Sequence, residues 1–322
     1  MGIQLGLIGL IVSGILAWTP SRAINPPDVR PHTIQFVDAE QTGPLTIRMP
    51  FRLSGHLIVV RGRIDGQTGN LILDTGAEGL VLNSAHIRQG IRPDHLAATG
   101  MTGAADRLGT YRPDSLLLSD MIFRRITADV VDLSHLEATR QIPILGLIGY
   151  RLLADYEVFI DFYLQQITLT RLDDQGFRLD SLAILETPSD SLAVRRKGHI
   201  LILEGYVKDH RLTFGLDTGA EVNMIDRRVK RRVFDHFELI KRVRLHGTGQ
   251  RTVEVMAGRL FRVRLGHIYC PPMNTLLTNL DEFSKSFGTN IDGVLGYEFL
   301  VDRRIVINYQ REMLFFYDIP RP

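Results

Sequence analysis

The feature that most constrains this chain is a motif that it contains twice. The tetrapeptide Asp-Thr-Gly-Ala begins at Asp74 and again at Asp217. A Gly-His pair precedes each Asp, and the spacing from His56 to Asp74 is the same as that from His199 to Asp217. The interval between the two copies far exceeds the roughly 20–50 residues of solenoid and propeller repeats. The chain is therefore predicted to be one domain duplicated.

A second shared segment follows each motif. An apolar-apolar-Gly triplet ends at Gly149 in the first copy and at Gly296 in the second, at a similar distance from its Asp. Between and after these anchors, short apolar runs are broken by Gly and polar residues, which is typical of all-β units. We predict an all-β, two-lobed protein with an N-terminal lobe over 24–172, a linker over 173–192 and a C-terminal lobe over 193–322.

Two segments allow more than one structural interpretation. Residues 24–50 form either a prosegment or the first strands of the lobe, and alternating runs favour strands. Asp226–Val243 has the clearest helical pattern, and its basic residues favour a solvated helix face over a nucleic-acid patch. The net charge of +2 gives no support to nucleic-acid binding.

The paired Asp residues suggest acid–base chemistry. Each follows an apolar strand, where partial desolvation raises a carboxyl pKa. Two lobes related by a two-fold would bring Asp74 and Asp217 so close that both cannot ionise, leaving one acid and one base. Thr75 and Thr218 offer hydroxyls to lock the two loops together. The absence of a side chain at Gly76 and Gly219 lets backbone pass near the carboxyls.

These residues resemble those of the aspartic protease superfamily. The two lobes are similar to those of pepsins, whereas their short, cysteine-poor form looks like paired retropepsin-like β-barrels of exported bacterial members. The resemblance covers both lobes and makes Asp74 and Asp217 the catalytic pair, an arrangement for which aspartic proteases are the standard example. Ala77 and Ala220 follow the motif as in retroviral enzymes. The apolar-apolar-Gly segments would pack behind the Asp loops: Leu147, Ile148 and Gly149; Val294, Leu295 and Gly296.

The resemblance also implies a flap, a hairpin that folds over the substrate. It is expected at Gly100, Met101, Thr102 and Gly103 in the first lobe, and at Gly247, Thr248 and Gly249 in the second. The flap tyrosine of pepsins has no clear counterpart, because Tyr111 lies too far along the chain. The pepsin disulfides are absent, since Cys270 is the only cysteine.

Other chemistries find no support in the sequence. The scattered histidines have no metal-site spacing, and His56 and His199 are interpreted as strand residues facing solvent or a neighbour. Cys270 is interpreted as inert packing. No phosphate loop, dinucleotide fingerprint or Gly-x-Ser-x-Gly elbow is present. We therefore predict neither a metal nor a cofactor.

The N-terminus predicts export. Ile3–Trp18 is apolar and uncharged but shorter than the ~20 residues of a membrane-spanning helix. A possible cleavage site after Ala23 makes residues 1–23 resemble a signal peptide. A retained membrane anchor and a buried element are the alternatives, so membrane contact is expected only if residues 3–18 are kept. The expected location is the periplasm, cell envelope or medium.

Together these features predict a monomeric aspartic endopeptidase that acts on peptide or protein substrates and does not bind nucleic acid. The alternative is a non-catalytic peptide-binding or envelope scaffold protein with the same fold, because a fold does not fix a function.

Overall fold

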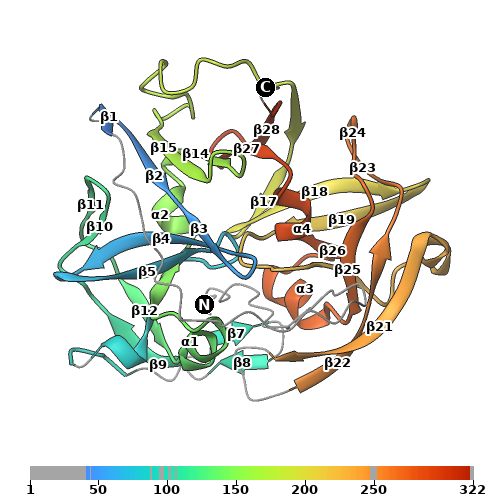
Figure 1. Ribbon diagram of the computed structural model, residues 1–322, viewed down its shortest axis with the longest axis horizontal. Coiled ribbons are helices and arrows are strands. Elements are labelled where there is room, and N and C mark those ends of the chain that lie inside the picture. The colour runs from blue at the N-terminus through green and yellow to red at the C-terminus, as the bar shows by residue number, and fades with distance from the viewer. Residues whose placement is uncertain are drawn as a thin grey trace, which may run out of the picture.

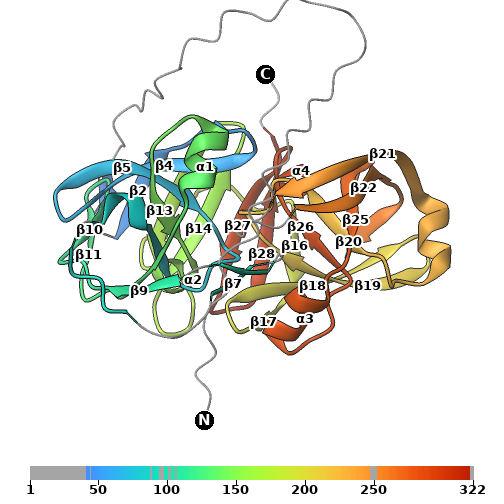
Figure 2. The same ribbon diagram turned by 90° about the horizontal axis from the view of Figure 1, so that it is seen from below.

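The computed structural model describes residues 41–43, 45–87, 89–93, 98–100, 103–105, 107–246 and 252–319. Most of these residues lie in strands, which form two curled sheets, a third sheet between them and one small hairpin. Figure 2 shows the two curled sheets as separate lobes, blue-green and yellow-orange, on either side of the third sheet. The structure confirms the predicted all-β, two-lobed architecture.

The first lobe is built on a sheet whose strands pair in the order β11-β10-β4-β5-β13-β6-β12-β9, with β3 beside β4. Its strands are β3 (Arg52–Ser54), β4 (Leu57–Ile64), β5 (Gln67–Leu73), β6 (Leu80–Asn83), β9 (Arg107–Tyr111), β10 (Leu116–Leu118), β11 (Met121–Phe123), β12 (Ala128–Val131) and β13 (Ile144–Ile148). The small hairpin consists of β7 (Ala98–Gly100) and β8 (Gly103–Ala105). The short helices of this lobe are η1 (Ser84–His86), α1 (Ser134–Arg140) and α2 (Tyr150–Leu153).

The second lobe repeats this plan in a sheet of order β21-β22-β25-β20-β26-β19-β18-β23-β24, with β17 beside β18. Its strands are β17 (Arg195–Lys197), β18 (Ile200–Val207), β19 (His210–Leu216), β20 (Asn223–Asp226), β21 (Phe237–His246), β22 (Thr252–Leu260), β23 (Val263–Leu265), β24 (Ile268–Tyr269), β25 (Met273–Thr278) and β26 (Gly293–Leu295). Its short helices are η2 (Arg231–His236), α3 (Asp281–Phe287) and α4 (Tyr297–Leu300).

The third sheet joins the lobes, with β14 of the first paired to β27 of the second. It runs in the order β1-β2-β15-β14-β27-β28-β16. Its strands are β1 (Gln41–Gly43), β2 (Thr46–Pro50), β14 (Tyr156–Asp161), β15 (Gln166–Arg171), β16 (Asp190–Ala193), β27 (Arg304–Asn308) and β28 (Met313–Tyr317). Two of these strands, β1 and β2, lie within residues 24–50, for which a prosegment and strands were the two interpretations. The strand β16 begins within the predicted linker, residues 173–192.

The strand that follows each Gly-His pair is buried on both faces along its first half. In β4, Ile58 and Val60 contribute to the main core, whereas Leu57 and Val59 face a smaller cluster beneath α1. Alternate residues of a strand point to opposite faces, so these continuous apolar runs fill two cores at once. β18 follows the same rule in the second lobe, which explains why both Gly-His motifs are followed by unbroken apolar residues.

The prediction of a helix over Asp226–Val243 is wrong. β20 ends at Asp226, the 3₁₀-helix η2 follows, and the chain then enters the long strand β21. The Asp226 carboxylate accepts backbone N–H bonds from Arg228 (2.7 Å) and Leu280 (2.9 Å), which fixes a turn where the pattern had a helix start. Backbone pairing of β21 with β22 then overrides the local pattern, because tertiary contacts outweigh weak helix propensity. None of the described helices is long and apolar enough to span a bilayer.

Candidate active site

The two Asp motifs lie at the ends of equivalent strands. β5 ends at Leu73 and β19 at Leu216, and each runs parallel to the strand of its own apolar-apolar-Gly segment, β13 or β26. Asp74 and Asp217 follow immediately, and both side chains are completely buried. Strand ends of this kind carry functional side chains on short, well-supported loops.

Each carboxyl is held by the backbone of its own loop. Oδ1 of Asp74 accepts N–H bonds from Gly76 (2.9 Å) and Ala77 (3.1 Å). Oδ1 of Asp217 accepts the N–H of Gly219 at 2.8 Å. These bonds orient both carboxyls with one oxygen in the loop and leave the second oxygen for other contacts.

The two loops meet face to face, so that each glycine lies against the opposite carboxyl. An ideal Cβ on Gly76 would lie 2.6 Å from the Asp217 carboxyl carbon, and one on Gly219 would lie 2.6 Å from that of Asp74. Contacts under 3.0 Å do not occur for a real Cβ. Only glycine permits this approach, and the approach is what brings the two carboxyls together.

The electrostatics of the pair follow from this geometry. The pKa of Asp74 is raised well above its usual range, mainly by burial and also by the nearby charge of Asp217 and a hydrogen bond with its carboxyl. The two backbone N–H bonds act in the opposite direction and lower the pKa, but their effect is smaller. Oδ2 of Asp74 accepts no N–H or hydroxyl bond among the described residues, so its polar neighbour is the Asp217 carboxyl. Two carboxyl oxygens attract only when a proton lies between them. Such a pair can hold a single proton between its two carboxyls.

The motif threonines cross-link the two lobes. The Thr75 N–H donates to Thr218 Oγ1 and the Thr218 N–H donates to Thr75 Oγ1, both at 3.0 Å. The Thr218 hydroxyl in turn donates to the Leu73 carbonyl at 2.9 Å. These bonds are buried and join segments that are far apart in the sequence. The structure thus places both hydroxyls between the loops, where the sequence analysis expected them.

The apolar-apolar-Gly segments lie directly behind the Asp loops. The Asp74 N–H donates to the Ile148 carbonyl at 2.9 Å, and the Asp217 N–H donates to the Leu295 carbonyl at 3.0 Å. An ideal Cβ on Gly149 would approach the Ala77 carbonyl oxygen to 2.5 Å. One on Gly296 would clash with the Ala220 carbonyl oxygen. Leu147 and Val294 complete the two segments and are fully buried.

The expected flap positions are only partly described. Gly100 and Gly103 pair across the β7–β8 hairpin, while Met101 and Thr102 between them lie outside the described residues. In the second lobe, β21 and β22 form a long hairpin from Phe237↔Leu260 to His246↔Thr252. Gly247, Thr248 and Gly249 at its end also lie outside the described residues. Hairpins therefore stand at both expected places.

The repeated histidines reach across the lobe boundary. His56 of the first lobe contacts the second lobe's loop, with Nδ1 3.0 Å from the Glu221 carbonyl oxygen. His199 of the second lobe contacts the first lobe's loop, with Nε2 2.9 Å from the Gly76 carbonyl oxygen. Because a carbonyl oxygen only accepts, these ring nitrogens carry the protons. Burial lowers the pKa of His199, which favours its neutral form.

Sequence reasoning missed the residue that follows the second motif. The carboxylate of Glu221 is buried, pairs with Arg140 of α1 and accepts the His56 N–H at 3.3 Å. Burial raises the pKa of Glu221 to about 7, although Arg140 and the His56 N–H act in the opposite direction. The signal was present in the sequence, because Glu78 occupies the same position of the first motif.

No group of three or more His, Cys, Asp and Glu side chains able to hold a metal occurs in the described part of the chain. Cys270 is buried within the core on the second-lobe side, and burial raises the pKa of its thiol. The acid and base groups that the two loops bring together are the carboxyls of Asp74 and Asp217.

A mirrored pair of Asp loops, cross-linked by threonines and backed by apolar-Gly segments, defines the aspartic protease class. A family model described as aspartyl protease matches the chain twice, over residues 60–152 and 203–299. Each match contains one Asp-Thr-Gly and one apolar-apolar-Gly segment. The chain therefore belongs to the aspartyl protease family, with one copy of the family domain in each lobe. No curated protein matches the chain.

Proposed function

We propose that the protein is an aspartic endopeptidase in which Asp74 and Asp217 activate water. The observation that carries this proposal is the mutual approach of the two loops, with two fully buried carboxyls against each other and the pKa of Asp74 raised by burial and by Asp217. Such a pair contains an acid and a base at the same pH.

In the proposed mechanism, water binds between the two carboxyls beside the scissile peptide bond. The ionised carboxylate takes a proton from the water as its oxygen attacks the carbonyl carbon. The protonated carboxyl donates to the carbonyl oxygen and stabilises the negative charge that develops there. Proton transfer to the amide nitrogen then permits C–N cleavage, and no metal or cofactor takes part.

The test is hydrolysis of an unfolded protein by the purified chain, with and without a statine-type inhibitor. Asp74→Asn and Asp217→Asn should each reduce turnover by roughly 1,000-fold or more, because each removes half of the dyad. Asp302→Asn is the matched control, since Asp302 is exposed, recurs in the repeat as Asp155 and lies outside the dyad. Peptide binding without turnover in the wild type would instead favour the scaffold alternative.

We further propose that one chain is the active unit. Both halves of the dyad come from the same chain, and tethering gives the partner lobe an effective concentration of roughly millimolar. Activity should co-elute with the monomer in size-exclusion chromatography. Recovery of activity after mixing the two Asp→Asn variants would contradict this, because only exchange of lobes between chains rebuilds an intact dyad.

Export is proposed from the apolar segment Ile3–Trp18 and the possible cleavage site after Ala23, which lie outside the described residues. N-terminal sequencing of the protein recovered from cell fractions tests it. A mature chain beginning at Ile24 is expected, whereas a chain beginning at Met1 in the membrane fraction would favour a retained anchor.

A further inference from the structure

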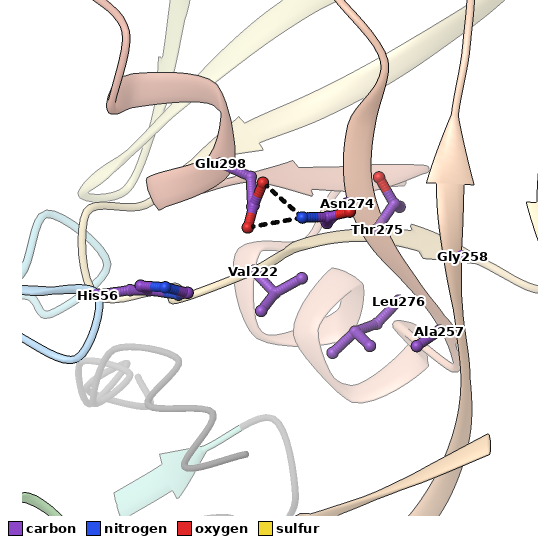
Figure 3. Close-up of a pocket in the computed structure, with 8 residues that line it drawn as sticks. All are labelled: His56, Val222, Ala257, Gly258, Asn274, Thr275, Leu276 and Glu298. Atoms are coloured by element: carbon purple, nitrogen blue, oxygen red, sulfur yellow. Dashed lines mark hydrogen bonds between the residues drawn. The ribbon is translucent and has the colours of Figure 1, made fainter. Parts of the chain in front are cut away.

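A pocket of about 150 Å³ opens beside the loop that carries Asp217. Val222, which follows the second motif closely, forms part of its wall, and Ala257 comes from the β22 strand of the long hairpin. Glu298 enters from α4, and His56 closes the pocket from the first lobe (Figure 3). The pocket therefore lies at the lobe boundary, lined by the chain that follows the Asp217 loop and by a strand of the long hairpin.

The lining has an apolar part and an anionic part. Val222, Ala257 and Leu276 are almost fully buried and form the apolar wall. Figure 3 shows the Glu298 carboxylate and Asn274 together on another side. The Asn274 amide donates to the two Glu298 oxygens, at 3.2 and 3.1 Å, which holds the carboxylate in place.

Glu298 has no cationic partner among the described residues. The ion pairs found in the described part of the chain do not include it, and its hydrogen-bond partner is the neutral amide of Asn274. The equivalent residue of the first lobe is Arg151, which follows Gly149-Tyr150 as Glu298 follows Gly296-Tyr297. Arg151 donates to Glu78 in its own lobe, with Nε at 3.0 Å. The repeat has thus reversed its charge at this position.

The buried Glu221 of the second motif does not depend on residue 298 for its charge balance. Glu221, the counterpart of Glu78, receives its positive charge from Arg140 across the lobe boundary. A carboxylate at position 298 therefore neutralises nothing in the described structure. It adds a negative charge to a pocket that also has an apolar wall, and this combination suits a long cationic side chain.

We infer that this pocket binds a Lys or Arg side chain of the substrate, with Glu298 as its counter-charge and as a specificity-determining residue. The inference rests on the proposed peptidase function. The size fits, because a cavity of roughly 150 Å³ accommodates a molecule as large as benzene, with six heavy atoms. An Arg side chain beyond Cβ also has six heavy atoms, and a Lys side chain has four. The aliphatic stem would contact Val222 and Leu276 while the cation reaches the carboxylate.

The experiment compares peptides that differ at one residue, placed in turn at each position around the cleaved bond. For one position, kcat/KM should be roughly 10-fold to 100-fold higher with Lys or Arg than with Met, as expected for a charge-assisted hydrogen bond. Glu298→Gln should reduce this Lys-to-Met ratio to near unity, and Glu298→Arg should favour Glu at that position. Using the ratio within each variant removes differences in the amount of active protein.

Glu282→Gln is the matched control. Glu282 is an exposed carboxylate on α3 that pairs with Lys285, so its removal should leave the ratio unchanged. Affinities of the same peptides for the Asp74→Asn chain are measured in parallel, which tests the pocket without turnover. A preference for Lys in binding together with no wild-type cleavage would refute the proposed function and support the pocket. Absence of a cationic preference in both assays, or a preference that survives Glu298→Gln, would overturn the inference.

Discussion

The replacement Gly76→Ala tests the central feature of the site, the approach of each loop to the opposite carboxyl. An ideal Cβ at this position lies 2.6 Å from the carbon and both oxygens of the Asp217 carboxyl. Carbon atoms in contact prefer about 3.5–4.0 Å, so the two groups must separate by about 1 Å. The Gly219 N–H and the threonine cross-links hold the loops in place. The Asp217 carboxyl must therefore move away from its position opposite Asp74.

The expected loss of activity follows from the displacement of the Asp217 carboxyl. A shift of about 1 Å in a reacting group reduces catalysis by roughly 100-fold. Overpacking of a single methyl group destabilises a protein by about 1–3 kcal/mol, which lowers the thermal midpoint by roughly 2–12 °C. We therefore expect Gly76→Ala to stay folded and to lose about 100-fold or more in kcat/KM, and Gly219→Ala to behave in the same way.

The assay is steady-state peptide hydrolysis with a thermal unfolding scan of each variant. Gly79→Ala is the matched control from the same loop, because its ideal Cβ meets nothing closer than Arg151 Cδ at 3.9 Å. This control should keep its activity within about threefold. Activity of Gly76→Ala close to that of Gly79→Ala would refute the reasoning, since the two carboxyls would then not need the contact.

Four further predictions follow from single groups. Thr218→Val should lower the free energy of unfolding by roughly 2–6 kcal/mol in urea, because it leaves two buried backbone groups without a partner, whereas Thr139→Val at an exposed hydroxyl should change it by less than about 0.5 kcal/mol. Tyr309→Phe should raise the free energy of unfolding by about 1–3 kcal/mol, since the buried Tyr309 hydroxyl has no partner among the described residues; a loss of stability would reveal one. The pKa of Glu221 is raised from 4.5 to about 7, so the folded state binds its proton more tightly and stability should fall by about 3 kcal/mol as the pH rises from 4.5 through 7, a slope that Glu221→Gln should remove. The raised pKa of Asp74 keeps the shared proton on the dyad to higher pH, so activity should peak at about pH 4–6 and fall as the pH rises; a rate still increasing below about pH 3 would contradict this.

The carboxyl pair could be predicted from the sequence because its determinants are local and repeated. An apolar strand, an Asp and two small residues fix each loop, and Leu73 and Leu216 end their strands where the pattern indicates. A single copy of such a loop is weak evidence. The second copy, at Asp217, made the pairing of two lobes the simplest interpretation.

The contacts between lobes could not be predicted in the same way. Arg140 lies far before Glu221 in the sequence, on a short helix with no distinctive pattern, and the pair forms only when the lobes have docked. The helix expected over Asp226–Val243 failed for a related reason, since β21 is stabilised by pairing with β22. Local patterns predict local structure, and interactions between distant segments override them where the two conflict.

The two lobes have equivalent Asp loops, but the charged residues around these loops differ. The site is therefore not symmetric. Glu78 is neutralised within its own lobe by Arg151, whereas Glu221 depends on Arg140 of the other lobe. A pair of identical lobes would present the same groups at both ends of a bound peptide. Here the equivalent positions carry Arg151, which is paired with Glu78, and Glu298, which has no ion-pair partner among the described residues, so under the proposed function the two ends of a substrate would meet different groups. Under the proposed function, duplication followed by such changes would orient a substrate in a way that a symmetric pair of lobes cannot.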